Sequence, residues 1–158
     1  MYFLYFFSLN LQEQQKKMLM WIFGTSVDKN INSLAILVLR LVSGSFMMVH
    51  GIQKLDMLKA NPIQFADPIG IGEPASLVLA VFAELICSAL LILGFMTRLA
   101  IIPLIITMLV AVFIVHSADG FEKQELGGLY LGVYVVLIIT GAGKFSVDRL
   151  IAKRKRRY

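Results

Sequence analysis

The sequence has few charged residues and almost no cysteine, and each shortage excludes a class of protein. Cys87 is the only cysteine among 158 residues, which excludes an intramolecular disulfide, a CxxC redox pair and a cysteine metal cluster. Its neighbours are apolar, so we expect a buried, unreactive thiol. Charged residues make up 16% and hydrophobic residues 58%, more apolar surface than a soluble domain of this size could bury. Redox chemistry would therefore need a partner or a bound cofactor.

Four long apolar runs occupy nearly the whole chain after residue 32, with a mean hydropathy of +0.79 overall. A membrane-spanning helix needs roughly 20 mainly apolar residues. We therefore predict an all-α fold, an integral membrane four-helix bundle over residues 33–150 with no soluble catalytic domain. The four spans are expected at about 33–53, 75–95, 99–116 and 125–143.

The two ends of the chain lie outside this bundle. Residues 1–32 begin with an aromatic run too short to span, followed by Lys16 and Lys17, the wrong order for a secretory signal. This segment is either an interfacial helix or an extension from an upstream start, with Met18 or Met20 as the functional beginning. Residues 151–158 form a basic tail that we expect to be cytoplasmic.

The distribution of lysine and arginine predicts the orientation. Eleven of these residues flank the spans on the side of both termini and of the turn at Arg98, whereas Lys54, Lys59 and Lys123 lie on the opposite side. Both termini are therefore expected in the cytoplasm. The basic tail, directly after a span, favours attraction to anionic lipid over nucleic-acid binding.

Two ionisable side chains lie inside the apolar runs. Arg40 belongs to the first run and Glu84 to the middle of the second, where a charge costs about 2.5–3.5 kcal/mol on the insertion scale. Their depths differ by only a few residues' rise, so we predict a buried Arg40–Glu84 ion pair that fixes helix register. Alternatively, one or both address a ligand, such as a quinone carbonyl or a transferable proton, and a pair that lines a cavity can do both.

A second polar group is expected at the outer ends of the spans. It contains His50, Gln53, Lys54, His116 and Glu125. These residues are ordinary at helix ends, or they line an outward-facing pocket for a quinone headgroup or a small polar substrate. Two histidines on different helices could bind a haem or a metal, but no Glu/His pair at i, i+3 or i, i+4 supports this, so no metal site is predicted and haem is disfavoured.

Small residues indicate where helix backbones approach each other. Gly44 and Gly51 lie seven residues apart in the first run, and Gly128 and Gly132 form a GxxxG step in the fourth. Such steps predict close packing, either within the bundle or in a homo-oligomer.

The order of these features resembles the DoxX family of four-span bacterial membrane proteins. The resemblance covers about residues 34–150 and lies in LRLVSGSFMMVHGIQKL, AELICSALLILGFMTRLA, the His116 end of the third run, and GAGKFSVDRL. It implies a four-helix bundle in the bacterial cytoplasmic membrane and a link to redox complexes, because relatives include a subunit of a thiosulfate:quinone oxidoreductase and proteins of oxidative-stress defence. No enzyme name carries over from it.

Two main hypotheses follow. The first is a subunit of a quinone-linked redox or oxidative-stress system, with Glu84 and His50 as candidate catalytic residues and quinone as the cofactor to test. The second is a non-catalytic subunit that docks a larger membrane complex through its loops and tail. A small-molecule permease is disfavoured because four spans leave little room for alternating access.

Overall fold

The computed structural model describes residues 2–23 and 28–155, and within these ranges every regular element is a helix. The chain divides into two units, residues 1–32 and 33–158. The first unit holds α1 (Tyr2–Phe23), where Glu13 and Lys17 form an exposed ion pair of 3.2 Å. Its interfacial role stays a prediction. The last part of the basic tail, residues 156–158, lies outside the described residues.

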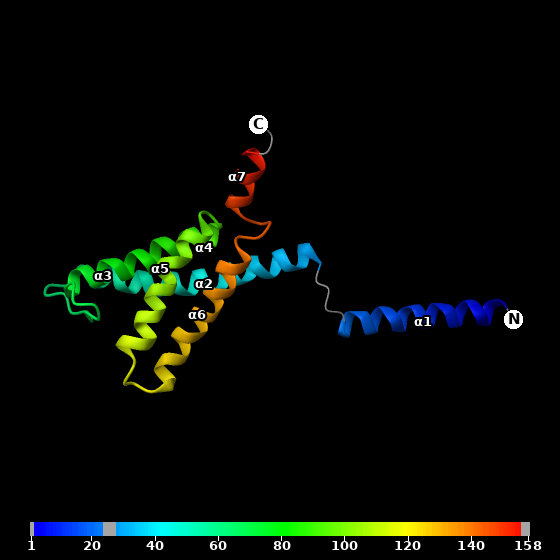
Figure 1. Ribbon diagram of the computed structural model, residues 1–158, viewed down its shortest axis with the longest axis horizontal. Helices are drawn as coiled ribbons and strands as arrows, with labels where there is room; N and C mark the ends of the chain where they lie inside the picture. Colours follow the sequence, from blue (N-terminus) through cyan, green and yellow to red (C-terminus); the bar gives the residue numbers. More distant parts are fainter. Residues whose placement is uncertain (1, 24–27, 156–158) are drawn as a thin grey trace. The chain divides into compact units, whose positions relative to one another are not determined.

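Helix α2 begins in the last residues of the first unit and continues into the second, which contains the other helices; Figure 1 shows them in chain order from cyan to red. Helix α3 continues without a break through the π-helix η1 into α4, and α5 continues into the π-helix η2. Helix α5 packs against α6 and η1, and α6 also packs against η2. The bounds are α2 (Lys29–Met57), α3 (Glu73–Val81), η1 (Phe82–Cys87), α4 (Ser88–Leu93), α5 (Thr97–Val110), η2 (Ala111–Val115), α6 (Phe121–Thr140) and α7 (Val147–Lys155).

Three of the described helical segments are long and apolar enough to cross a membrane, namely Lys29–Met57, Glu73–Leu93 and Thr97–Val115. They coincide with the first three predicted spans to within four residues at each end. Helix α6 lies at the fourth predicted span but is not among the three, and it carries Glu122, Lys123 and Glu125 near its start. The fourth span therefore remains a prediction.

A glycine ends α4 and makes the turn into α5. Gly94 has φ +67°, a left-handed conformation that glycine adopts at little cost. Its N–H donates to Leu91 O at 3.1 Å, and the Phe95 N–H donates to Leu90 O at 3.0 Å, which is the Schellman pattern. The turn brings α5 back antiparallel against the preceding helix.

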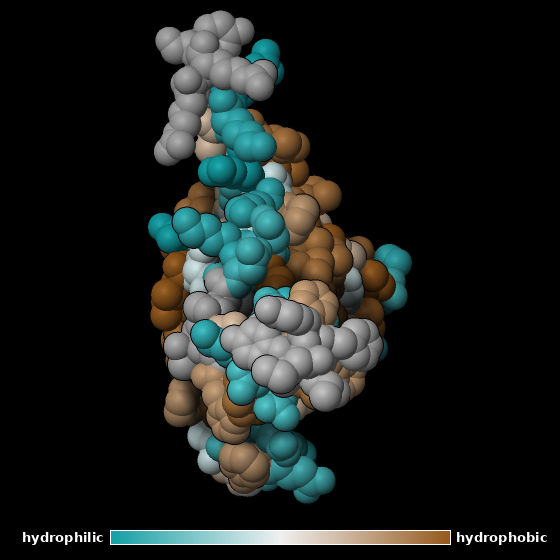
Figure 2. All heavy atoms as spheres, turned by 90° about the vertical axis from the view of Figure 1, so that its right-hand side faces the viewer, coloured by the Kyte–Doolittle hydropathy of each residue, from teal (hydrophilic) through white to brown (hydrophobic). Residues whose placement is uncertain are grey.

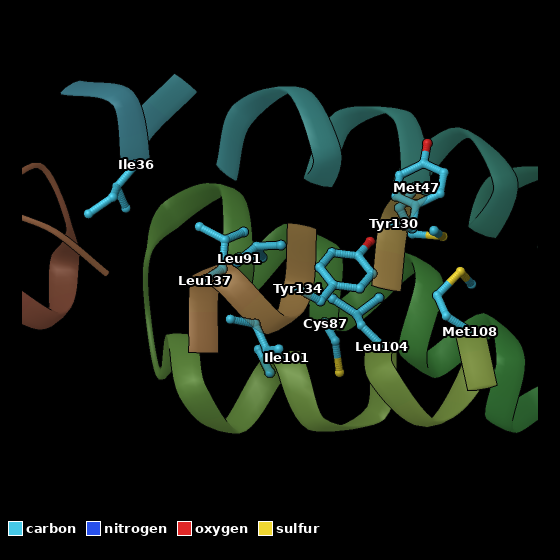
Figure 3. Packing of buried hydrophobic residues seen from close by; sticks show 11 residues of the cluster. Ile36, Met47, Cys87, Leu91, Ile101, Leu104, Met108, Tyr130, Tyr134 and Leu137 are labelled. Atoms are coloured by element: carbon cyan, nitrogen blue, oxygen red, sulfur yellow. The ribbon is translucent and has the colours of Figure 1, made fainter. Parts of the chain in front are cut away.

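The core is formed where α2, η1, α4, α5 and α6 meet. Figure 3 shows Tyr134 in the middle of this cluster, beside Cys87 and Leu104. Cys87 is 2% exposed, as its apolar neighbours predict. Outward-facing side chains such as Phe46 and Ile139 are also apolar and well exposed, and hydrophobic residues reach the surface on both flanks of Figure 2. An apolar exterior around a packed core suits a protein surrounded by lipid.

Candidate functional site

Arg40 occupies a cage of backbone carbonyl groups. Its guanidinium donates to Leu91 O at 2.9 Å and to Ile92 O at 2.7 Å, at the C-terminal end of α4. It also donates to Ala142 O at 2.7 Å and Phe145 O at 2.8 Å, in the segment after α6. The side chain is 1% exposed. A helix C-terminus carries unpaired carbonyls and a partial negative charge, so one buried cation satisfies four acceptors there.

The predicted ion pair between Arg40 and Glu84 is wrong, because each side chain has other partners, although both residues are buried as expected. The guanidinium donors are used by carbonyl groups. Glu84 instead accepts from Lys54 Nζ, at 2.5 Å to each carboxylate oxygen. Arg40 contacts two carbonyl acceptors at the end of α4 and two in the segment after α6. Lys54, near the other end of α2, neutralises Glu84.

Asp148 completes the structure around Arg40 by capping α5. Its carboxylate accepts from the Met96 N–H at 2.8 Å and the Thr97 N–H at 3.0 Å. Partial burial pushes the pKa of Asp148 upward, but the hydrogen bonds from Thr97 and Met96 and the nearby Arg40 charge outweigh it and lower the pKa below its usual value. A Cβ at Gly94 would collide with the Arg40 guanidinium. This centre is a structural joint between helix ends.

The Lys54–Glu84 pair forms a second, separate polar centre. The Glu84 side chain is 2% exposed and that of Lys54 is 26% exposed. The bond is charge-assisted and bidentate on the carboxylate, the strong class of hydrogen bond. Removing a carboxylate from water costs free energy that one ammonium partner only partly offsets. Because this pair lies in the walls of two cavities, it is a candidate functional site.

Both π-helical segments lie at this second centre. Glu84 is in η1, and His116 directly follows η2. Single π-turns inside α-helices are rare and frequent at functional sites. Opposite η1, a Cβ at Gly51 would lie 2.6 Å from Leu85 N and 2.7 Å from Glu84 C, so only glycine lets α2 approach this backbone.

The larger of the two cavities has a volume of about 280 Å³ and is mainly apolar. It lies between the loop after α2, helix α3, η1 and the α5–η2 helix. Its volume is close to the lower bound of roughly 300 Å³ for small-molecule pockets. The polar side chains in its wall are Lys54, Ser76, Glu84, Thr107 and His116, and apolar ones include Phe65, Pro68, Ile69, Leu79, Ile106 and Val110.

The loop over this cavity is organised by Asp67. Its carboxylate accepts from Ser76 Oγ at 2.8 Å, the Gly72 N–H at 2.8 Å and the Ile71 N–H at 3.0 Å. The hydrogen bond from Ser76, followed by that from Gly72, lowers the pKa of Asp67. Asp67 thereby ties the loop to the start of α3 and places Pro68 in the cavity wall.

The smaller cavity, about 170 Å³, lies on the α6 side of the same ion pair. The His50 ring meets Tyr130 edge-on at a centroid distance of 6.4 Å, and Tyr130 stacks on Tyr134 at 6.0 Å. Of the five predicted outer-pocket residues, three line this cavity, whereas Gln53 and Glu125 are exposed and line neither cavity. Its polar lining consists of His50, Lys54, Glu84, His116, Lys123 and Tyr130.

The mouth of the smaller cavity carries a small charge network. His116 Nδ1 lies 2.8 Å from Asp119 Oδ2, and Lys123 Nζ lies 3.5 Å from the same oxygen. The hydrogen bond with His116, followed by the charge of Lys123, lowers the pKa of Asp119. The sequence pattern did not predict Tyr130, Lys123 or Asp119 as site residues. The four-residue spacing of Tyr130 and Tyr134 on one helix face was a usable signal.

The predicted packing glycines divide into two classes. A Cβ at Gly44 would lie 2.7 Å from Ile92 Cγ1, and Gly51 meets η1 as described, so both lie at close helix contacts. Gly128 and Gly132 are exposed, and a Cβ at either would meet nothing within 4 Å. In the part of the chain that the structure describes, the GxxxG step therefore lies at no close helix contact. Among the described residues, no group of three His, Cys, Asp or Glu side chains could hold a metal ion.

Comparisons with known proteins point to one family. The DoxX family profile matches residues 35–117. An uncharacterized membrane protein of Mycobacterium tuberculosis is 28% identical over 76% of this chain and 83% of its own length. CatD of Bacillus subtilis, a candidate oxidoreductase by its name, is 29% identical over 76% of this chain and 89% of its own. An uncharacterized protein of Haemophilus influenzae is 32% identical over 73% of this chain and 90% of its own length. No solved structure matches significantly.

Proposed function

This chain belongs to the DoxX family, and we propose that it is an integral membrane subunit of a quinone-linked redox or oxidative-stress system in the bacterial cytoplasmic membrane. The relatives described above are bacterial, and one of them carries an oxidoreductase name. The proposal rests mainly on one observation, the Lys54–Glu84 ion pair in the wall of an apolar cavity.

In the proposed arrangement four helices cross the membrane and both termini are cytoplasmic. Helix α6 provides the fourth span, with its charged first turns at the outer surface. The excess of lysine and arginine on the side of the termini supports this orientation. Helix α7 carries Lys153 and Arg154 at an exposed end of the second unit, where anionic lipid headgroups would attract them.

The larger cavity suits a quinone ring because its wall combines apolar side chains with a few convergent donors. A bound quinone would supply two-electron chemistry coupled to two protons. Lys54 and His116 would donate hydrogen bonds to ring oxygens, and Glu84 holds the Lys54 ammonium at 2.5 Å. Phe65, Leu79 and Ile106 would exclude water from the ring. His50 belongs to the other cavity, so its part would be indirect.

The experiment is the quinone content of protein purified in mild detergent from its native membranes. We expect near-stoichiometric quinone in the wild type, a large loss in Glu84→Gln and a smaller loss in His50→Ala. Glu122→Gln, an exposed carboxylate at the start of α6, is the matched control and should keep its quinone. Equal background quinone in all four folded proteins would refute the proposal.

A non-catalytic docking subunit is the second candidate, and the open face of α6 favours it. Within residues 2–23 and 28–155, no atom lies within 4 Å of a Cβ built at Gly128 or Gly132, which leaves a small-residue surface for another helix. Truncation after Leu150 removes most of α7 and should release a docked partner while the bundle stays folded. A complex that survives this truncation in native gels would exclude a docking role for the tail.

A further inference from the structure

The two cavities share a wall. Lys54, Glu84, Ala111 and His116 line both of them. The ion pair therefore lies between a mainly apolar compartment and one whose lining has a larger polar share. Beyond the shared wall, the smaller cavity adds His50, Tyr130 and Lys123, which can donate or relay hydrogen bonds.

The smaller cavity also joins the buried carboxylate to the surface. In its wall the Glu84 side chain is 2% exposed, whereas the side chains of His116 and Lys123 are 38% and 63% exposed. A volume of about 170 Å³ holds roughly five waters at about 30 Å³ each. Two to four polar partners suffice to order a water, and the polar lining offers more than that.

We propose that this smaller cavity is a hydrated chamber through which solvent at the 116–120 turn exchanges protons with the Lys54–Glu84 pair. The proposal deepens the proposed function, on which its use of a quinone rests. The ring would lie on one side of the ion pair and the water on the other. Proton supply and ring binding would then meet at Lys54 and His116 and otherwise use different residues.

The proton step balances within the chain and its solvent. A bound quinone would supply the acceptor of electrons and protons; Lys54 would give up one N–H proton to its reduced oxygen and would be left as a neutral amine beside the Glu84 carboxylate. A proton from water in the chamber, passed by way of His50 or His116, then restores the ammonium. Two such transfers accompany two electrons, which a low-potential donor provides; in the assay below this donor is dithionite.

Hydration is tested first, on the unmodified protein and without any quinone. Hydroxyl radicals made from water by X-ray pulses label side chains that lie beside water, and mass spectrometry locates the label. Tyr130 lines the chamber, and Tyr134, one helical turn away and 0% exposed, is the internal control. We expect label on Tyr130 and little on Tyr134. Equally weak labelling of both rings would overturn the proposal.

The route is tested with two cavity-filling variants. Val112→Phe fills the smaller cavity and Leu79→Phe the larger one, since each residue lines only that cavity. With bound quinone reduced by dithionite, Val112→Phe should keep quinone but slow proton uptake by roughly a hundredfold, the lower end of what a positioned proton donor contributes. Leu79→Phe should lose quinone. Loss of the Tyr130 label in Val112→Phe would show that the smaller cavity is filled. If the rate of proton uptake in that variant nevertheless equals the wild-type rate, the proposed proton route is wrong.

The two proposals can fail separately. A wild type without quinone refutes the proposed function, while the Tyr130 label still decides whether the chamber is hydrated. A wild type with quinone but an unlabelled Tyr130 refutes only the chamber. Should Val112→Phe fail to fold, Gly127→Ala narrows the same cavity, because its Cβ would meet Val112 Cγ2 at 2.7 Å.

Discussion

Replacing Arg40 with methionine would remove the donor of four hydrogen bonds while keeping much of the side-chain volume. The carbonyl groups of Leu91, Ile92, Ala142 and Phe145 would remain in place without that partner. A buried acceptor left unsatisfied costs about 1–3 kcal/mol. Because Leu91 O keeps a hydrogen bond from the Gly94 N–H and the other three bonds are only partly buried, we take about 1 kcal/mol for each of those three, and hence about 3 kcal/mol in total.

A loss of this size is a large part of the roughly 5–15 kcal/mol that separates folded and unfolded domains. Arg40→Lys keeps the charge but provides at most three donors from a single atom, so an intermediate loss is expected. Arg98→Met is the matched control. Arg98 is exposed and makes one long bond of 3.4 Å to Ile139 O, so its loss should stay within about 0.5 kcal/mol.

The assay is equilibrium unfolding in detergent micelles with increasing denaturant, followed by far-ultraviolet circular dichroism. The order of midpoints should be wild type and Arg98→Met together, then Arg40→Lys, then Arg40→Met. If Arg40→Met unfolds at the same midpoint as Arg98→Met, the carbonyl cage does not stabilise the joint between α4 and the segment after α6. The reasoning would then be refuted.

Two further predictions concern close packing and acid stability. Gly51→Ala should destabilise the protein by about 1–3 kcal/mol, because its Cβ would lie within 3 Å of the η1 backbone. Gly128→Ala is the control and should be tolerated in the same unfolding assay. Equal losses of stability in the two variants would contradict the close contact at Gly51. Asp148 has a lowered pKa in the folded protein, so its contribution is fully present above the ordinary value of 3.8 and is lost as the pH falls through its lower folded value. Acid unfolding of the wild type should therefore show a stability loss in that range which Asp148→Asn lacks, and parallel curves would contradict it.

The helical architecture followed from local pattern, and three of the described helices are long and apolar enough to be the first three predicted spans. Runs of apolar residues long enough to cross a bilayer leave a helix as the only way to satisfy the backbone within one segment. Burial of Arg40 and Glu84 could also be predicted, since an ionisable group inside such a run must face the protein interior. The π-helical turns at Glu84 and before His116 were not predicted from the sequence pattern.

The partners of the buried charges could not be predicted from the same pattern. Depth along the membrane normal placed Arg40 near Glu84, but it did not tell which helix ends would come within reach. The acceptors of Arg40 lie 51 to 105 residues away in the chain. Similarly, Lys54 belongs to the predicted outer group, yet its ammonium extends to Glu84. A long side chain can reach several partners, and helix packing selects among them.

Hydrophobicity and helix length act locally. The amino-acid sequence was therefore sufficient to predict a membrane environment, the helices and the side chains that must be buried. The tertiary structure decided that Arg40 joins helix ends, that Lys54 neutralises Glu84, and that this pair separates two cavities. Glycines at positions 44 and 51 permit those contacts, while the GxxxG step at 128 and 132 stays open. Hydrogen bonds and cavities depend on the relative placement of distant segments, which only their packing sets.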